Sequence, residues 1–219
     1  APPPAPLPPS AAPPAGEAPA PRALVLPLDR VARLVTLGAA EVCAIGDDRI
    51  CCSEDGGITW EPPVALPARA LAAIRVGASR LVAAADGGVY ELRAGATPTL
   101  WSRPPEAIAV VDAATHGGAL WLLGHRYDDP ADELRLPQVV ETQVFRLGDD
   151  GALERRAALP GYAGERIRVD AGGAVVTWAP FDRRAWRSTD GGRRFERVEA
   201  ERFGADYGGL QVAVERRAD

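Results

Sequence analysis

Short apolar runs, separated by connections rich in Gly, Asp and Pro, recur along most of this 219-residue chain. The runs group in fours, and no stretch keeps a helical period for three turns. The four groups cover residues 30–67, 68–105, 106–160 and 165–199. Four antiparallel strands in about 38 residues is the size of one blade of a β-propeller. The pattern therefore predicts an all-β chain, a β-propeller or part of one, built from four-stranded antiparallel blades.

Each apolar run is predicted to be one strand. In the first two units the strands are Val31–Leu37, Val42–Ile45, Arg49–Ser53 and Ile58–Glu61, then Ala70–Val76, Arg80–Ala85, Val89–Arg93 and Thr99–Arg103. In the last two they are Ala107–Ala113, Ala119–His125, Thr142–Leu147 and Ala152–Ala158, then Arg166–Asp170, Ala174–Trp178, Ala185–Ser188 and Arg194–Glu199. Two further runs, Ala23–Leu28 and Leu210–Glu215, are predicted to pair and help to close a ring. Because an open stack of sheets leaves exposed edges, we also expect that another chain or segment completes the propeller.

The N-terminal segment differs in composition from the rest of the chain. Residues 1–27 hold 11 of the 21 prolines, and alanine fills most of the gaps. Such a segment favours the extended polyproline conformation and cannot bury enough surface to fold alone. We predict an Ala/Pro-rich tether over residues 1–21 and a propeller domain over residues 22–219. The small residue Ala1 and the tether favour an exported protein, periplasmic or extracellular and associated with the envelope, although excision of an initiator Met or trimming would leave the same start.

Charge and hydrophobicity exclude several classes of protein. Hydrophobic residues make up 47% of the chain, which excludes wholesale disorder. The net charge of −5 argues against a nucleic-acid partner, because such binding needs a basic face that releases counterions. No apolar run approaches the length that a membrane-spanning helix requires, so no membrane span is predicted.

Two hairpin turns share one sequence pattern. They read Ser53-Glu54-Asp55-Gly56-Gly57-Ile58-Thr59-Trp60 and Ser188-Thr189-Asp190-Gly191-Gly192-Arg193-Arg194-Phe195, and both lie between the third and fourth predicted strands of their unit. Glycine reaches positive φ at low cost, and an Asp carboxylate can accept hydrogen bonds from backbone N–H groups within a turn. The aromatic residue then covers the junction of the strands.

This pattern resembles the Asp-box, or BNR repeat, S-x-D-x-G-x-T-W. The repeat occurs in sialidases, in sortilin-type receptors and in photosystem II assembly-factor propellers. The resemblance covers roughly residues 30–199, and it implies propeller blades whose Asp-box residues are structural and face away from the usual binding site. The residues that carry this structural role are Ser53, Asp55, Gly57, Thr59, Trp60, Ser188, Asp190, Gly192 and Phe195.

The sequence lacks the catalytic pattern of the sialidases that it resembles. Their early arginine sits in a Phe/Tyr-Arg-Ile-Pro sequence, which this chain does not contain; Phe181-Asp182-Arg183-Arg184 is only a superficial echo. No catalytic residue, cofactor or metal site is therefore predicted. If the protein were an enzyme, a glycoside hydrolase would be the class that the resemblance implies.

The largest departure from the repeat is an insertion at residues 126–141, between the second and third predicted strands of the third unit. Long loops on a rigid scaffold often carry function, so this insertion is the candidate binding site. Its candidate residues are Arg126, Tyr127, Asp128, Asp129, Asp132 and Glu133. The four acidic residues could supply oxygen ligands to Ca²⁺, but the spacing is not that of an EF-hand. A solvated loop and a protein-contact loop remain the two alternatives.

The three cysteines, Cys43, Cys51 and Cys52, all lie in the first unit. A turn at Asp47–Asp48 places Cys43 opposite Cys52 on the neighbouring strand, where side chains are close. A cross-strand disulfide between them is one interpretation, and it suits an exported protein. Three buried, reduced thiols are the other. In both cases Cys51 points to the opposite face as a small buried apolar residue.

These features together favour a non-catalytic, exported protein-interaction scaffold, an accessory or assembly subunit of an envelope complex with a protein partner. The alternative is a glycan-binding or glycan-cleaving fragment related to the sialidase-like propellers. The five tryptophans fall at or beside predicted strands, so we expect them to pack between blades. A glycan-binding role would instead use one of them as a stacking platform for a sugar ring.

Overall fold

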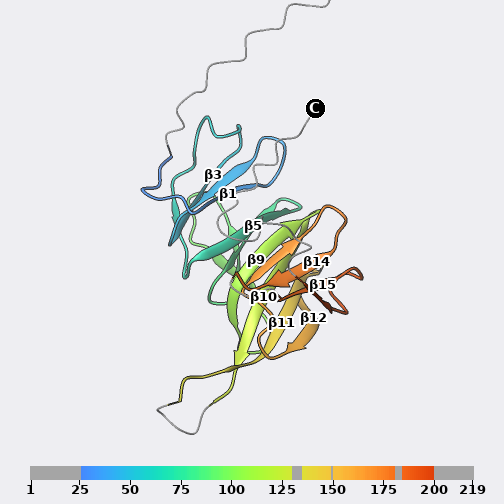
Figure 1. Cartoon of the computed structure of the whole chain (residues 1–219). Coiled ribbons are helices and arrows are strands. Elements are labelled where there is room, and N and C mark those ends of the chain that lie inside the picture. The colour runs from blue at the N-terminus through green and yellow to red at the C-terminus, as the bar shows by residue number, and fades with distance from the viewer. Residues whose placement is uncertain (1–25, 130–134, 149, 181–183, 200–219) are drawn as a thin grey trace, which may run out of the picture.

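The computed structural model describes residues 26–129, 135–148, 150–180 and 184–199. These residues form four antiparallel sheets of four strands each, arranged as the blades of a β-propeller (Figure 1). Within every blade the strands are neighbours in the order in which they occur in the sequence. The described residues contain no helix, and hence none long and apolar enough to cross a membrane. The predicted fold class is thus confirmed.

The four blades are numbered in chain order. Blade 1 contains β1 (Arg33–Thr36), β2 (Val42–Ile45), β3 (Arg49–Ser53) and β4 (Val64–Ala65), and blade 2 contains β5 (Ala70–Val76), β6 (Ser79–Ala84), β7 (Val89–Leu92) and β8 (Thr99–Ser102). Blade 3 contains β9 (Ala109–His116), β10 (Ala119–Tyr127), β11 (Val139–Leu147) and β12 (Leu153–Pro160), and blade 4 contains β13 (Arg166–Val169), β14 (Val175–Trp178), β15 (Arg184–Ser188) and β16 (Glu196–Glu199). The predicted strands lie within a few residues of these bounds, with two exceptions.

The first exception is the fourth strand of blade 1, which was predicted at Ile58–Glu61. That prediction is wrong, because β4 is Val64–Ala65 and pairs with β3. The backbone N–H groups of Ile58 and Thr59 donate to the Asp55 carboxylate instead of to a neighbouring strand. The local turn therefore consumes the donors that a strand at this position would need.

The second exception is the predicted N-terminal strand Ala23–Leu28. Residues 26–28 are not in a strand, and residues 23–25 lie outside the described part of the chain, as do the tether over residues 1–21 and the predicted strand Leu210–Glu215.

The hydrophobic core lies between the blades rather than at one centre. Three clusters fill the interfaces of blade 1 with blade 2, of blade 2 with blade 3, and of blade 3 with blade 4. Strand β10 shows how a middle blade serves two interfaces: Leu120 and Leu122 pack toward blade 2, whereas Trp121 and Leu123 pack toward blade 4. Side chains alternate between the faces of a strand, so a strand buried on both faces reads as a continuous apolar run.

A charged pair connects the first strands of the four blades. Arg33 on β1 donates to the backbone oxygen of Leu71 on β5 at 2.6 Å. Its guanidinium also lies 3.8 Å from the carboxylate of Asp112 on β9, and that carboxylate accepts the backbone N–H of Ile167 on β13 at 3.0 Å. We call Arg33 and Asp112 the axial pair. It adds polar contacts between blades to the apolar contacts of the core.

Asp112 is expected to make stability depend on pH. Burial raises its pKa, against the opposing effects of the Ile167 N–H and of the nearby Arg33 and Arg166. A raised pKa means that the folded protein holds this proton more tightly than the unfolded chain, whose Asp pKa is about 3.9. Protonated Asp112 thus adds stability at low pH, and this contribution is lost as the pH rises through the folded pKa.

The test compares the wild type with Asp112→Asn, which cannot titrate, by urea unfolding at pH values from about 7 down to about 3.5. The difference in unfolding free energy should shift in favour of the wild type as the pH falls. Other acidic groups titrate alike in both proteins and cancel from the difference. A difference that stays constant across the series would show that Asp112 has an ordinary pKa.

Candidate functional site

The first of the two Ser-x-Asp turns is held together by its own carboxylate. Asp55 accepts hydrogen bonds from the Ser53 hydroxyl at 2.7 Å, from the Ile58 N–H at 2.9 Å, and from both the N–H and the hydroxyl of Thr59 at 2.8 and 2.6 Å. The hydrogen bonds from Thr59 and Ser53 lower the pKa of Asp55 well below its usual range. The Trp60 indole N–H closes the turn by donating to the oxygen of Gly57 at 3.0 Å.

The second turn, in blade 4, repeats this arrangement. Asp190 accepts from the Ser188 hydroxyl at 2.8 Å and from the N–H groups of Arg193 and Arg194 at 3.0 and 2.9 Å. The Gly192 N–H donates to the Ser188 oxygen at 2.9 Å, and Phe195 packs against the core between blades 3 and 4. Both carboxylates are therefore engaged inside their own turns.

An ionic cluster that the sequence pattern does not reveal joins blade 1 to blade 2. The guanidinium of Arg80, which is only 8% exposed, contacts Glu41 at 2.5 Å, Glu54 at 2.6 Å and Glu61 at 2.7 Å. Arg75 lies 2.7 Å from the same Glu41 carboxylate. Burial lowers the pKa of Arg80, but the hydrogen bonds to Glu61 and Glu41 outweigh this effect and raise it overall, so that Arg80 remains charged. The sequence places all these residues at turns or strand ends, yet nothing in it indicates which acid meets which arginine.

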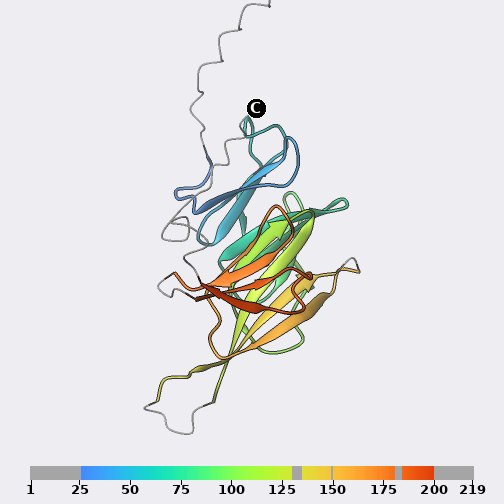
Figure 2. The same ribbon diagram turned by 45° about the vertical axis from the view of Figure 1, so that its right-hand side comes forward.

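The described residues of the predicted insertion, 126–129 and 135–141, form the far ends of β10 and β11 and the chain next to them, and they extend beyond the body of the propeller (Figures 1 and 2). Asp128 holds the base of this hairpin: its carboxylate accepts from the Arg135 guanidinium and from the Gln138 N–H, both at 2.6 Å. The Asp128 N–H also donates to the Gln138 oxygen at 2.9 Å. The Asp128 carboxylate is thus engaged within its own hairpin.

The other charged residues predicted as site residues in the insertion do not form one cluster in the described structure. Arg126 lies 3.7 Å from Glu141 on the paired strand, and Asp129 is exposed. Asp132 and Glu133 fall in residues 130–134, outside the described part of the chain. Among the described residues, no three acidic, His or Cys side chains come together as a metal would require.

The hairpin exposes apolar side chains as well as charges. Tyr127 is 43% exposed, Leu136 78% and Val140 37%. Tyr127 and Val140 lie on the paired ends of β10 and β11, and Leu136 lies in the connection just before β11. Single exposed apolar side chains are common on protein surfaces, but here three of them lie on one projecting hairpin.

His125 connects the base of the hairpin to blade 4. This residue is 2% exposed, and its Nε2 lies 2.7 Å from the backbone oxygen of Gly164. Its ring centroid is 6.1 Å from that of Tyr127 and 5.5 Å from that of Tyr162. His125 therefore packs inside the structure, and the two half-exposed tyrosines flank it.

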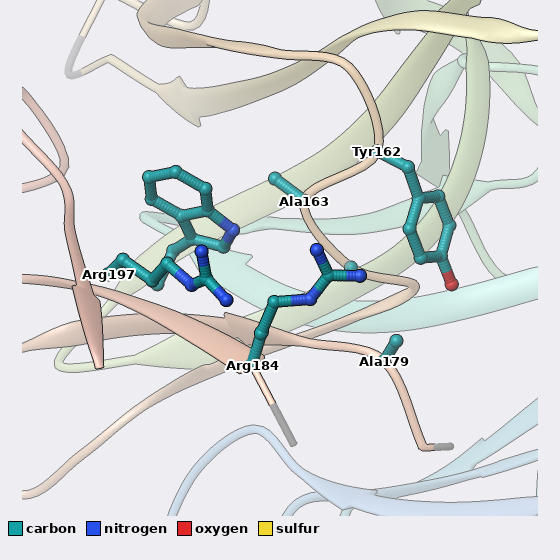
Figure 3. A pocket seen from close by; sticks show the side chains of 7 residues that line it. Tyr162, Ala163, Ala179, Arg184 and Arg197 are labelled. Carbon is teal, nitrogen blue, oxygen red and sulfur yellow. The ribbon is translucent and has the colours of Figure 1, made fainter. Parts of the chain in front are cut away.

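A small cavity begins beside Tyr162. It has a volume of about 40 Å³ and is lined by Tyr162, Ala163, Gly164, Ala179, Arg184, Trp186 and Arg197. In Figure 3 the side chain of Arg184 lies between those of Arg197 and Tyr162. We call this pocket the arginine cavity. Its lining comes from the connection between β12 and β13, from the residue after β14, and from β15 and β16.

The sequence does contain a signal for the arginine cavity. Arg184 and Trp186 are two positions apart on one strand, so their side chains point to the same face of the sheet. Trp186 pairs directly with Arg197 on the next strand. In the sequence, Arg184 is visible only as part of an echo of a catalytic pattern, and its proximity to Arg197 is not. The pairing across the β15–β16 hairpin was needed to bring the two arginines together.

The structure also positions the cysteines. Cys43 and Cys52 are register partners on β2 and β3 and form a disulfide. Both lie in the core between blades 1 and 2. Cys51 is a buried free thiol whose pKa is raised by burial.

Solved structures with the same fold include two that cover most of this chain. One is described as "YCF48 bound to D1 peptide"; it has a TM-score of 0.53 and 14% sequence identity, over 83% of this chain and 57% of that chain. The other is a streptogramin B lyase, with a TM-score of 0.50 and 14% identity, over 76% of this chain and 53% of that chain. The chain thus spans little more than half the length of these proteins, and at this identity the likeness shows the fold alone. No family model and no curated protein matches the chain.

Proposed function

We propose that this protein is a non-catalytic interaction scaffold that binds a protein partner through the β10–β11 hairpin. One observation carries the proposal: Tyr127, Leu136 and Val140 are exposed on a projecting hairpin whose base is fastened by Asp128. Exposed apolar side chains on a pre-ordered element can be buried by a partner at a low cost in conformational entropy. The structure "YCF48 bound to D1 peptide" offers a precedent for a peptide partner on a propeller of similar fold.

We further propose that the protein is exported and acts as an accessory or assembly subunit of an envelope complex. The Cys43–Cys52 disulfide supports export, because disulfides persist in oxidising compartments. A gain of two hydrogen atoms in intact mass on reduction of the purified protein would support the disulfide and hence export, and an unchanged mass would contradict them.

The Ser-x-Asp turns of blades 1 and 4 support membership of the Asp-box propellers, since the two turns share one hydrogen-bond pattern.

The partner, or a further segment, is also proposed to complete the propeller. The described residues form four blades, and the chain covers 57% and 53% of the two similar propeller chains, so those proteins have room for additional blades. A complex whose mass exceeds that of one chain, with blade 1 and blade 4 protected from proteolysis, would support this idea.

The hairpin is tested with Leu136→Asp, which places a charge where an apolar contact is expected. Tagged wild-type protein should co-purify a stoichiometric partner from an envelope extract, and the variant should retain at least tenfold less. The matched control is Leu100→Asp, because Leu100 is 49% exposed on β8 in blade 2 and should tolerate the same change without loss of the partner.

Circular dichroism must first show that both variants keep the wild-type spectrum. Equal retention of the partner by Leu136→Asp and by the wild type would contradict the proposed surface. Binding of sialosides or β-glucans by the purified chain would instead favour a glycan-binding propeller.

A further inference from the structure

Three partly exposed apolar side chains gather around the buried His125, where the base of the hairpin meets blade 4. Tyr127 is 43% exposed, Val140 37% and Tyr162 42%. The ring centroid of His125 lies 6.1 Å from that of Tyr127 and 5.5 Å from that of Tyr162. The backbone oxygen of Val140 accepts the Gly161 N–H at 2.9 Å, which holds the Tyr162 loop against the hairpin. We call Tyr127, Val140 and Tyr162 the aromatic patch.

The aromatic patch is uncharged and presents two tyrosine rings at a defined spacing. Tyr162 makes a further interaction within the chain, yet 42% of its surface stays exposed. Because both rings lie against His125, their separation cannot exceed the sum of the two centroid distances. That limit accommodates the rise of a polyproline helix over one turn of three residues, about 9.3 Å. Surfaces lined by aromatic side chains are what proteins use to bind proline-rich segments in this conformation.

The chain itself carries a segment of this kind. The Ala/Pro-rich tether, residues 1–21, is predicted to favour the polyproline conformation, and Pro3, Pro6 and Pro9 occupy every third position within it. A polyproline helix has three residues per turn, so these three prolines would lie along one edge. Glu17 is the one charged side chain among residues 1–21. The tether thus matches the uncharged patch in chemistry and in period.

The tether is long enough to reach the patch of its own chain. The described part of the chain begins at Leu26, and the hairpin projects from the end of the molecule away from blade 1 (Figures 1 and 2). An extended segment from Leu26 back to Pro6 spans about 60 Å at about 3.1 Å per residue. A folded unit of this size has a radius of gyration of only about 15 Å. Attachment also gives the segment an effective concentration on the order of millimolar, so that even weak docking is favoured.

We propose that the aromatic patch receives the proline-rich segment Pro3–Pro9 of the same chain. The prolines pack on the tyrosine rings, and the tyrosine hydroxyls donate to backbone oxygens, which have no internal partner in a polyproline helix. This inference rests on the proposed function, because Tyr127 and Val140 belong to the proposed partner surface. It adds the regulation of that surface: a partner must displace the segment before it can bury the two residues.

The test uses the whole 219-residue chain and the peptide fluorescein-Pro-Pro-Pro-Ala-Pro-Leu-Pro-Pro-Ser-amide, which copies residues 2–10. We call the variant with Pro3→Ser, Pro6→Ser and Pro9→Ser the open-patch chain. The open-patch chain should bind the peptide in a saturable manner, as measured by fluorescence polarisation. The wild type should bind the peptide at least tenfold more weakly, because its own segment competes for the patch.

Two matched controls identify the segment and the patch. A chain with Pro13→Ser, Pro14→Ser and Pro19→Ser loses as many prolines from the tether but should bind the peptide as weakly as the wild type. In the open-patch chain, Tyr127→Ser should weaken binding at least fivefold. Trp101→Ser should leave it unchanged, because Trp101 is equally exposed, at 43%, but lies on β8 in blade 2. Circular dichroism must show the wild-type spectrum for each variant.

Several results would overturn the proposal. One is a peptide that fails to bind the open-patch chain, and another is equal binding by the wild type. Equal losses in Tyr127→Ser and Trp101→Ser would place the peptide elsewhere on the molecule. A wild-type dimer in analytical ultracentrifugation that dissociates in the open-patch chain would show that the segment occupies the patch of another chain, which also contradicts docking within one chain.

The hairpin variant separates this inference from the proposed function. Leu136 lies outside the aromatic patch, so Leu136→Asp should leave peptide binding by the open-patch chain unchanged. If the peptide fails to bind while the wild type captures a partner that Leu136→Asp loses, the docking of the segment is wrong and the scaffold stands. If the peptide binds as expected but Leu136→Asp captures the partner normally, the proposed partner surface is wrong and the docking stands.

Discussion

Replacing Arg80 with alanine is expected to lower the free energy of unfolding by about 3–5 kcal/mol, because it removes a cation that three carboxylates share at the seam of blades 1 and 2. Glu41 is 11% exposed in its side chain and Glu61 28%, so neither can be fully rehydrated in the folded protein. Arg75 still pairs with Glu41 in the variant, but Glu54 and Glu61 lose their contact. The carboxylates would then repel one another across an interface from which water is partly excluded.

Urea unfolding at neutral pH measures this loss. The control is Arg93→Ala, which breaks an ion pair with Glu91 but removes a side chain that is 72% exposed; exposed pairs contribute about 0–1 kcal/mol. A loss below about 1 kcal/mol in Arg80→Ala would place the cluster among such surface pairs. Arg80→Lys should recover only part of the stability, because one ammonium cannot reach three carboxylates in the fixed directions of a guanidinium.

Truncation of Trp121 to alanine should also reduce the free energy of unfolding by about 3–5 kcal/mol. Trp121 is 5% exposed and packs between blade 3 and the Ser-x-Asp turn of blade 4. The contact is so close that a Cβ atom at Gly192 would lie 2.7 Å from the indole ring. The Arg146 guanidinium lies 5.8 Å from the ring centroid. Alanine would leave a void that neither the turn nor the strand can fill.

The matched control for Trp121→Ala is Trp101→Ala. Trp101 makes the equivalent contact between blade 2 and blade 3, where its indole N–H donates to Gly151 at 3.2 Å, but it is 43% exposed. Its removal should therefore cost about 1 kcal/mol. Thermal unfolding followed by circular dichroism compares the two variants. Similar losses for both would show that burial of the ring does not determine its contribution.

Much of the fold was predictable because strand periodicity and turn composition are local properties. The runs Val42–Ile45, Arg49–Ser53 and Ala70–Val76 coincide with β2, β3 and β5. The prediction failed at Ile58–Glu61, where the apolar residues belong to a turn that competes with the strand for the same backbone donors. The residue types at Ile58–Glu61 favour a strand and do not indicate this outcome. The group that binds the backbone donors is the carboxylate of Asp55, three positions before Ile58.

The candidate site was only half predictable. The insertion at residues 126–141 was visible as a break in the repeat, and its described residues lie at the far ends of β10 and β11, beyond the body of the propeller. The role of Asp128 was not visible, since its contacts with Arg135 and Gln138 depend on how the hairpin closes. The arginine cavity was missed for a similar reason: Arg184 and Arg197 are separated in sequence and meet only through the register of β15 and β16.

The axial pair has a consequence for how the protein unfolds. In a linear array of repeats each unit contacts only its neighbours, so the terminal units can detach first. Arg33 belongs to the first blade but contacts the backbone of the second and the carboxylate of the third, and that carboxylate binds the backbone of the fourth. Separation of blade 1 would remove Arg33 from the buried Asp112 carboxylate and leave Arg166 as the cation near it. We therefore expect the opening of blade 1 to be coupled to the other three blades rather than to occur independently.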